Sequence, residues 1–368
     1  MRRVSRSLYS SLVLIVALAL TVAAEAKGPP PGKGGGGEPT VDHSAAQALP
    51  IQLGSSGGNA DDQANGYCCG GTLGSLVEIG GQQFILSNAH VFAGDLVSGG
   101  NGGVSTLGDA ILQPGLIDSG CSASGASPVA SLSDWSDLQD PGHNVDAAIA
   151  QVVPGAVRAD GSILEIGPVS VATAPAVLNM PVKKSGRSSG LTQGTVAVLD
   201  ATVTVGYSDE CAGDSFTKTF DNQILVTPGR FIRSGDSGSL MVEDVVNLPR
   251  PVGLLFAGSQ RVAVANPIDE VLAFFAARMV DGATADGAEV AVESARANAR
   301  AAQQRASAEL LRVPGAQGHG IGLSSRRPGE LAIKLLVERI SRSTIEAAPT
   351  EIDGVAVELM EVGRITAY

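Results

Sequence analysis

The sequence predicts an all-β fold over about residues 50–275, followed by a small α+β segment. Short apolar and β-branched runs recur in the first region and alternate with clusters of Gly, Asp, Ser and Pro, which are typical of tight turns. Examples are Ser75–Ile79, Phe84–Leu86, Thr195–Val198 and Val252–Phe256. About 225 residues are enough for two six-stranded barrels that each bury their own core.

Helical patterns are concentrated in the last third of the chain. Residues 267–278 predict a helix that closes the β region, and residues 287–312, which lack proline, predict a longer one. Three strands are expected after it, at 320–323, 331–337 and 355–362. We therefore expect residues 281–368 to form an accessory domain for docking a regulatory partner or for control.

Residues 1–26 are typical of a secretory signal peptide, with a basic start, an apolar run and a small-residue cleavage site ending at Ala26. The apolar run is shorter than the about twenty residues of a membrane span. Residues 27–48 are rich in Gly and Pro and are expected to be a linker. The sequence thus predicts an exported protein, periplasmic or extracellular, without a permanent membrane anchor.

The charge balance argues against a nucleic-acid partner. The formal net charge is -12 at pH 7, and removal of the signal peptide, with three arginines and one glutamate, makes it -14. Nucleic-acid binding requires basic surface. Gly318–Gly322 does not complete a dinucleotide-binding fingerprint either, and no cofactor is expected.

Four cysteines, Cys68, Cys69, Cys121 and Cys211, predict disulfides in an exported chain. Adjacent cysteines rarely bond each other, so one or both of the first two should reach the others, with the pairing left open. The spacing contains no C-x₂-C pair, and we expect no metal site.

The stretch Arg233–Val242 has the pattern of a nucleophile loop. Ser237 lies in Gly-Asp-Ser-Gly, and an apolar run that predicts a strand follows it. A serine hydroxyl is a weak nucleophile until a base removes its proton, and the tetrahedral product carries a negative oxygen. Glycines allow the tight backbone turn that brings amide N–H groups onto such an oxygen. By itself, the motif is equally consistent with a polar turn.

A histidine and an aspartate complete the pattern. His90 ends the apolar run that begins at Phe84, and Asp146 precedes the apolar run Ala147–Ala150. Three other aspartates compete for the second role, but they lie in polar sequence with no apolar run behind them: Asp134, Asp137 and Asp140. His143 is expected to be a surface loop residue, and His43 and His319 fall outside the predicted barrels.

The order His90, Asp146, Ser237 resembles that of the trypsin/chymotrypsin superfamily of serine peptidases. Lys184–Val196 resembles the strand pair that opens the second barrel of streptogrisin-like enzymes. Together with Leu53–Asn59 and Cys68–Gly74, the motifs are most similar to the bacterial and narrow-leaf-type plant trypsin-like peptidases.

This resemblance implies a chymotrypsin-like double β-barrel over residues 49–280, with the active site between the barrels. It implies that Ser237 is the nucleophile, His90 the general base and Asp146 the residue that orients the histidine. It also implies an oxyanion hole formed by the backbone N–H groups of Gly235 and Ser237.

The same resemblance places the floor of the substrate pocket at Phe231 and its wall on the strand that carries Leu255 and Gly258. Neither position offers a charge to pair with Arg, Lys or Glu, so small or medium apolar residues should be preferred before the cleaved bond. Arg230 and Arg233 flank the floor residue and leave a preference for acidic residues as the alternative. Arg187 is expected to be structural. No new N-terminus able to pair with Asp236 is visible, so the partner of this acid stays unknown.

Three kinds of function follow from these patterns. The first is a secreted serine endopeptidase acting on proteins or peptides. The second is an inactive barrel that serves as a binding module, and the third is a peptidase restricted to its own chain or to one partner. The complete set of His90, Asp146 and Ser237 argues against the second, because loss of function usually removes one member.

Overall fold

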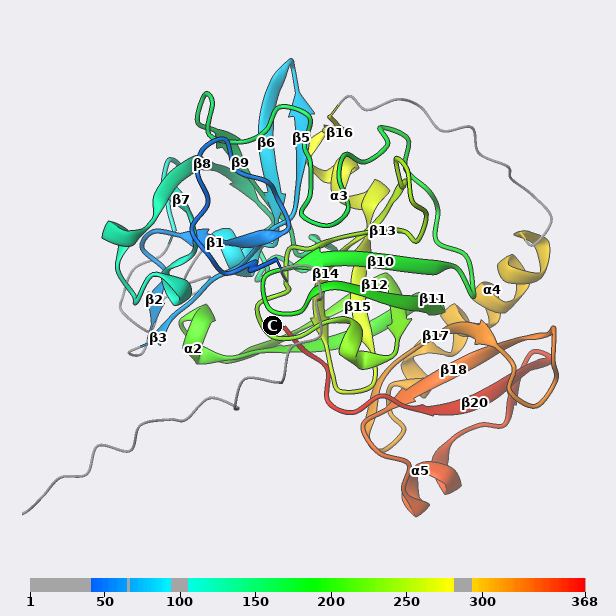
Figure 1. Ribbon diagram of the computed structural model, residues 1–368. Helices are drawn as coiled ribbons and strands as arrows, with labels where there is room; N and C mark the ends of the chain where they lie inside the picture. The colour runs from blue at the N-terminus through cyan, green and yellow to red at the C-terminus, as the bar shows by residue number, and fades with distance from the viewer. Residues whose placement is uncertain (1–40, 65–66, 94–104, 281–292, 368) are drawn as a thin grey trace, which may run out of the picture. The chain divides into compact units, whose positions relative to one another are not determined.

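The computed structural model describes residues 41–64, 67–93, 105–280 and 293–367 (Figure 1). The predicted signal peptide and most of the predicted linker lie outside these residues. Among the described helices, none is long and apolar enough to cross a membrane.

The first barrel is an antiparallel sheet with the strand order β5-β6-β9-β8-β7-β1-β4. Only Gly74 separates β4 from β5, so these two act as one bent strand and the sheet closes on itself. The Cβ of any other residue at position 74 would lie 2.0 Å from the carbonyl oxygen of Gly238. The strands are β1 (Ser55–Asn59), β4 (Gly71–Leu73), β5 (Ser75–Ile79), β6 (Gln82–Ser87), β7 (Ala110–Gln113), β8 (Ser127–Trp135) and β9 (Ala148–Val152).

The second barrel has the order β10-β13-β14-β15-β12-β11, and β11 pairs again with β10 to close it. All of these pairings are antiparallel. The strands are β10 (Pro181–Gly186), β11 (Gly190–Tyr207), β12 (Phe216–Thr227), β13 (Leu240–Glu243), β14 (Pro251–Gly258) and β15 (Ala263–Pro267). Two closed six-stranded barrels are therefore present, as the sequence predicts.

Short elements complete the barrel region. The helix α3 places Ile268, Val271 and Phe275 on one face, and these side chains join the core of the first barrel. This helix thus connects the end of the second barrel to the first. The short elements are β2 (Gln63–Ala64), β3 (Tyr67–Cys68), α1 (Ala89–Phe92), α2 (Asp209–Ala212), α3 (Ile268–Phe275), β16 (Arg278–Met279) and 3₁₀ turns at Leu116–Asp118, Ala123–Gly125 and Gly229–Phe231.

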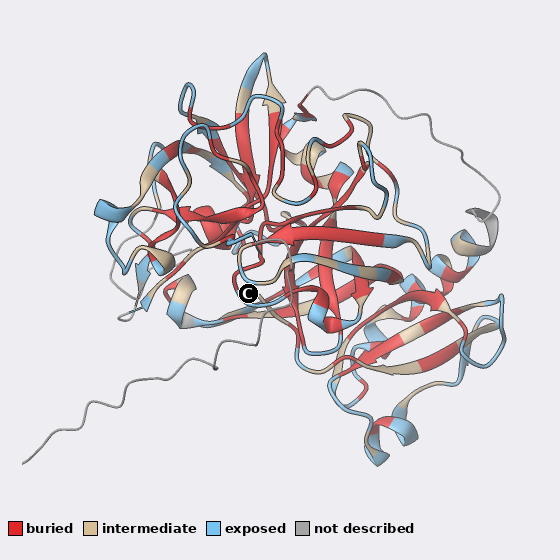
Figure 2. Ribbon diagram, in the orientation of Figure 1, coloured by how far each residue is buried: buried red, intermediate tan, exposed pale blue. Residues whose placement is uncertain are grey.

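The C-terminal segment contains the predicted helix and three predicted strands, and it adds to the sheet of the second barrel. Strand β17 pairs with the middle of β11, with His319 opposite Thr202, and the order continues as β17-β18-β20-β19. The helix α4 lies against this sheet (Figures 1 and 2). Its residues Ala299, Ala302 and Ala306 join the apolar cluster between the helix and the sheet. The elements are α4 (Glu293–Leu310), β17 (Ala316–Leu323), β18 (Leu331–Val337), α5 (Arg342–Ala347), β19 (Glu351–Ile352), β20 (Val355–Glu361) and β21 (Thr366–Ala367).

Two disulfides link segments that are far apart in the sequence. Cys68 bonds Cys121, and Cys69 bonds Cys211. Both adjacent cysteines therefore reach a distant partner, one in the first barrel and one after β11. This confirms the disulfide prediction and settles the pairing that the sequence left open.

His319 ties the C-terminal sheet to α4. Its ring nitrogens lie 2.8 Å from Gln303 Nε2 and 2.7 Å from Ser307 Oγ, and the side chain is buried. A ring that accepts from the Gln303 amide must be neutral, with its other N–H directed to Ser307. Burial lowers the pKa of His319 to about 4, against a smaller opposing effect of Asp221.

The free energy of unfolding should therefore fall as the pH drops from about 6.5 towards 4. In that window the unfolded chain binds a proton at His319 that the folded chain does not, and the loss reaches about 3 kcal/mol. Urea titrations of the wild type and His319→Gln at several pH values measure this. An equal pH dependence in both proteins would contradict the assignment.

Candidate active site

Ser237 lies in a tight turn between the second barrel's 3₁₀ turn and β13. Gly235 and Gly238 have φ values of 92° and 91°, which glycine adopts at little cost. A Cβ at position 238 would also lie 2.1 Å from Ser87 Oγ, so only glycine fits there. The Ser237 hydroxyl donates to the carbonyl oxygen of Phe256 at 3.1 Å. The Gly-Asp-Ser-Gly motif thus specifies the backbone of this loop.

His90 and Asp146 form a buried pair. His90 belongs to α1, directly after β6, and its Nδ1 lies 2.6 Å from Asp146 Oδ2. An ionised carboxylate only accepts hydrogen bonds, so Nδ1 carries the proton and Nε2 is the basic nitrogen. The backbone N–H of His90 also donates to Asp146 Oδ1 at 3.3 Å. A histidine oriented in this way can act as a general base.

Tyr207, which no sequence motif singles out, supplies another contact to Asp146. Its hydroxyl donates to Asp146 Oδ2 at 2.9 Å, and its ring stacks on Phe216 with a centroid distance of 4.6 Å. Burial, and next the charge of Asp146, raise the pKa of Tyr207 well above its ordinary value. The phenol therefore remains a donor. No motif surrounds Tyr207; only its place at the end of β11 gives it this role.

The nucleophile loop and the His90 helix lie side by side across β4. The N–H of Thr72 donates to the Ser237 carbonyl at 2.8 Å, and its hydroxyl donates to the Gly235 carbonyl at 2.9 Å. A Cβ on Gly71 would lie 2.9 Å from the Ser237 carbonyl oxygen and 2.7 Å from a methyl of Val91, the residue after His90. The structure therefore brings the three predicted residues to the junction of the two barrels.

The predicted oxyanion donors have a suitable backbone. Within the described part of the chain, the N–H groups of Gly235 and Ser237 have no hydrogen-bond acceptor, whereas both carbonyl groups are held by Thr72. Such donors can stabilise negative charge that develops on a substrate oxygen.

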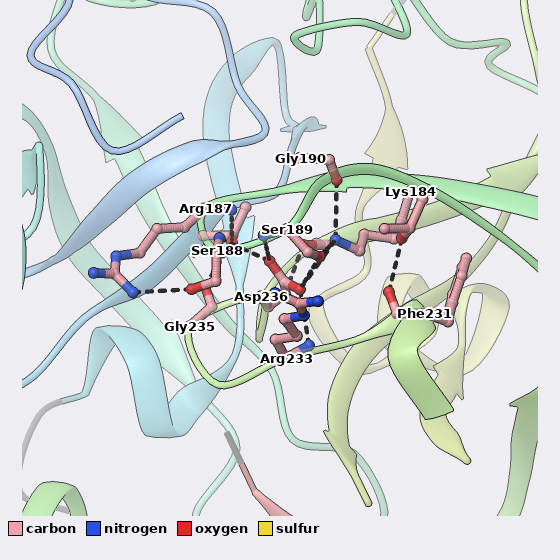
Figure 3. A network of polar contacts seen from close by, with 12 residues as sticks. Lys184, Arg187, Ser188, Ser189, Gly190, Phe231, Arg233, Gly235 and Asp236 are labelled. Atoms are coloured by element: carbon pink, nitrogen blue, oxygen red, sulfur yellow. Dashed lines mark hydrogen bonds and ion pairs between the residues drawn. The ribbon is translucent and has the colours of Figure 1, made fainter. Parts of the chain in front are cut away.

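The partner of Asp236 is Lys184, and their contact is fully buried (Figure 3). Lys184 Nζ lies 3.1 Å from Asp236 Oδ2, and both side chains are 0 % exposed. The carboxylate also accepts from the backbone N–H groups of Ser188, Ser189 and Arg233 at 2.8 to 3.1 Å. The ammonium group of Lys184 thus provides the charged partner of Asp236, the residue before Ser237.

The ammonium group of Lys184 makes two further hydrogen bonds. It donates to Ser189 Oγ at 2.5 Å and to the Gly190 carbonyl at 3.0 Å. Burial lowers the pKa of Lys184, and Asp236 opposes this shift. The sequence contained the signal, because Lys184 opens the motif that resembles the second barrel's first hairpin, but its spatial partner was not deducible.

The predicted pocket residues occupy different environments. Phe231 and Leu255 lie in the interior of the second barrel, where Phe231 packs close to Gly194. Gly258 lies at the end of β14. Arg230 and Arg233 are exposed. Arg187 pairs with Asp118 through Nε at 2.5 Å and a second nitrogen at 2.6 Å, which gives it a structural contact as predicted.

Two further histidines, His43 and His143, make hydrogen bonds away from Ser237, His90 and Asp146. His43 is buried, with Nδ1 2.7 Å from the Gly54 carbonyl and Nε2 2.7 Å from Glu165. His143 accepts from the backbone N–H of Asp137 at 2.9 Å. Among the described residues, no group of His, Cys, Asp and Glu is arranged to hold a metal ion.

Two closed antiparallel barrels with this junction define the architecture. The fold is chymotrypsin-like. Comparison with protein-family models finds no match, and comparison with curated proteins finds none either.

Comparison with solved structures finds bacterial serine proteases, with low sequence identity and low TM-scores. A glutamic acid specific serine protease that uses a histidine triad in substrate binding is 18% identical, with a TM-score of 0.42 over 62% of this chain and 100% of its own. Thermobifida fusca protease A is 16% identical, with a TM-score of 0.38 over 63% and 99%. An alpha-lytic protease homolog is 16% identical, with a TM-score of 0.39 over 62% and 98%.

The buried Lys184–Asp236 pair should dominate the stability of the nucleophile loop. Lys184→Met leaves the Asp236 carboxylate buried without its cation, which typically costs about 3–5 kcal/mol. Lys183→Met is the matched control, because Lys183 lies on the same strand and its ammonium donates, among the described residues, to the Val245 carbonyl alone. Urea denaturation measures both.

The double variant Lys184→Met/Asp236→Asn should recover part of the loss, since it removes the uncompensated charge. If Lys184→Met were as stable as Lys183→Met, the ion pair would not have this role.

Proposed function

We propose that the chain is an exported serine endopeptidase that cleaves peptide bonds through Ser237, His90 and Asp146. The observation that carries the proposal is the hydrogen-bonded pair of His90 Nδ1 and Asp146 Oδ2 beside the turn that presents Ser237. The two disulfides support export to an oxidising compartment, periplasmic or extracellular.

The mechanism uses each group once in each half of the reaction. His90 Nε2 takes the Ser237 proton as Oγ attacks the scissile carbonyl, and the N–H groups of Gly235 and Ser237 stabilise the oxyanion. The imidazolium then protonates the leaving amine, which leaves an acyl-enzyme. A water molecule, deprotonated by His90, attacks the ester, and the imidazolium returns a proton to Ser237 Oγ as the acid product leaves. Asp146 stabilises the imidazolium in both steps.

The preference for small or medium apolar residues before the cleaved bond remains part of the proposal. Phe231, Leu255 and Gly258 carry no charge, so the pocket offers no partner for a charged side chain. Discrimination between neighbouring apolar residues should then be modest, about 1–3 kcal/mol per methylene. A peptide library varied at this position measures it, and dominant cleavage after Arg, Lys or Glu would exclude the apolar pocket.

Substitution of the three residues should nearly abolish hydrolysis. Ser237→Ala, His90→Ala and Asp146→Asn should each lower kcat by roughly 10³-fold or more, and the losses should not add, because the residues act as a unit. Ser234→Ala, an exposed neighbour in the same loop, is the control. Turnover of a peptide ester measures the effect, and wild-type activity of Ser237→Ala would refute the assignment.

A fluorophosphonate label separates a peptidase from an inactive binding module. It should modify the wild type at Ser237 and leave Ser237→Ala unmodified, as mass spectrometry of the labelled peptide would show. An unlabelled wild type would favour a barrel that only binds.

The Tyr207→Phe variant tests whether the hydrogen bond from Tyr207 to Asp146 contributes to activity. Loss of a hydrogen bond to a charged acceptor is worth about 1.5–3 kcal/mol, so kcat/KM should fall roughly 10- to 100-fold. Tyr67→Phe, an exposed tyrosine, is the control. The ionisation that limits activity on the acidic side should also shift, which a purely structural tyrosine would not change. Unaltered activity and pH profile would exclude this role.

A further inference from the structure

The last strand of the chain returns to the second barrel. After β20 the chain crosses to β14, where β21 pairs antiparallel with it: Ala367 opposes Ala257, and Thr366 opposes Gly258. Thr366 also pairs in parallel with Gly206 of β11. Figure 1 shows the red C-terminal segment leaving the outer sheet and ending beside β14.

Buried contacts fix the approach of this segment. Val362 and Ile365 are 0 % and 1 % exposed and belong to the same apolar cluster as Phe256. The Gly206 N–H donates to the Ile365 carbonyl at 3.1 Å, and the Ser259 hydroxyl donates to the Val362 carbonyl. The position of β21 is therefore set by packing on the barrel.

The residues of β14 that pair with β21 follow directly after Phe256, which contacts Ser237. The Phe256 carbonyl oxygen accepts from Ser237 Oγ at 3.1 Å, and β14 continues from there through Ala257 to Gly258. Because β21 runs antiparallel, its direction from Thr366 to Ala367 leads back towards Ser237.

This direction is that of the acyl half of a peptide substrate. An extended peptide that binds by adding a strand to a sheet edge gains main-chain hydrogen bonds and places alternate side chains in pockets. The carbonyl that a serine attacks ends the acyl half, so that half must approach with its C-terminal end towards Oγ. The strand β21 meets this requirement. Ser237 is also 0 % exposed in this arrangement.

We propose that the segment Ile365–Ala367 of this chain occupies the edge of β14 at Ala257 and Gly258 in the orientation of the acyl half of a peptide substrate, and thereby competes with substrates for the site. The inference rests on the proposed function. It assigns Ala367 and Thr366 to the second and third positions before the cleaved bond. It also assigns a partner: extended peptides with small residues at these two positions, which compete with the segment.

An intramolecular ligand acts at an effective concentration in the millimolar range when its connection is short and well placed. A short product peptide that binds weakly in solution can therefore still hold the site closed when it belongs to the same chain. The peptidase would then be slow until this segment is displaced.

The test compares the full chain with a variant that lacks residues 366–368, a deletion that retains the buried Ile365. The rate of fluorophosphonate labelling at Ser237 should rise roughly tenfold or more in the shortened chain. Arg364→Ala is the matched control, since Arg364 is exposed in the same segment, and it should label like the full chain.

The peptide Ile-Thr-Ala-Tyr, added at millimolar concentration, should slow labelling of the shortened chain and compete with a peptide ester. The reversed peptide Tyr-Ala-Thr-Ile should not. Equal labelling of the full and shortened chains would overturn this inference and leave the peptidase intact. No labelling of any variant would overturn the proposed function itself.

Thr366→Pro covers the case in which the deletion destabilises the fold. Proline lacks the N–H needed for strand pairing but keeps the length of the chain. With circular dichroism unchanged, labelling should again be faster than in the full chain. A Thr366→Pro protein that is folded and labels no faster would overturn the inference.

Discussion

The ion pair between Lys184 and Asp236 is the interaction on which the candidate site depends. Asp236 precedes the nucleophile, and its carboxylate collects N–H groups from two loops, so its position determines the turn that presents Ser237. A carboxylate buried without a cation would be strongly unfavourable. Lys184 supplies that cation from β10, within the same barrel. The loop therefore adopts its shape as the second barrel folds.

Glycines allow the closest approach of the two barrels. Gly71 and Gly74 on the first barrel approach Ser237 and Gly238 on the second at distances that a Cβ would prevent. Hydrogen bonds from Thr72 at this junction hold the nucleophile loop against β4. A catalytic arrangement divided between two barrels needs such a rigid junction, because an error of about 1 Å in position can cost two orders of magnitude in rate.

The sequence predicted the parts of this structure that are encoded locally. The alternation of short apolar runs with turn residues predicted both barrels, and the motifs around His90, Asp146 and Ser237 predicted residues that meet at their junction. The helix α4 and the strands β17, β18 and β20 were also predicted, since propensity and periodicity act over a few residues. The disulfide prediction was confirmed, although the pairing was visible only in the structure.

The contacts that the sequence could not provide are those between distant segments. Tyr207 is 61 residues from Asp146, and no local pattern distinguishes it from any other strand tyrosine. The contact of Lys184 with Asp236 depends on how β10 and the nucleophile loop fold back on each other. The same is true of β21, whose two residues are too short for a periodic signal and are placed by Val362 and Ile365.

The long strand β11 has a consequence for any attempt to isolate the barrels. It pairs with β10 and β12 within the second barrel and with β17 outside it, around Leu199 and Val203. A protein shortened at about residue 280 would expose this row of backbone groups, together with the apolar side chains of the second barrel that pack with Leu336, Val362 and Ile365. Unpaired, apolar strand edges promote association between molecules. Insolubility of such a fragment would therefore reflect a cut through a continuous sheet, whatever its catalytic competence.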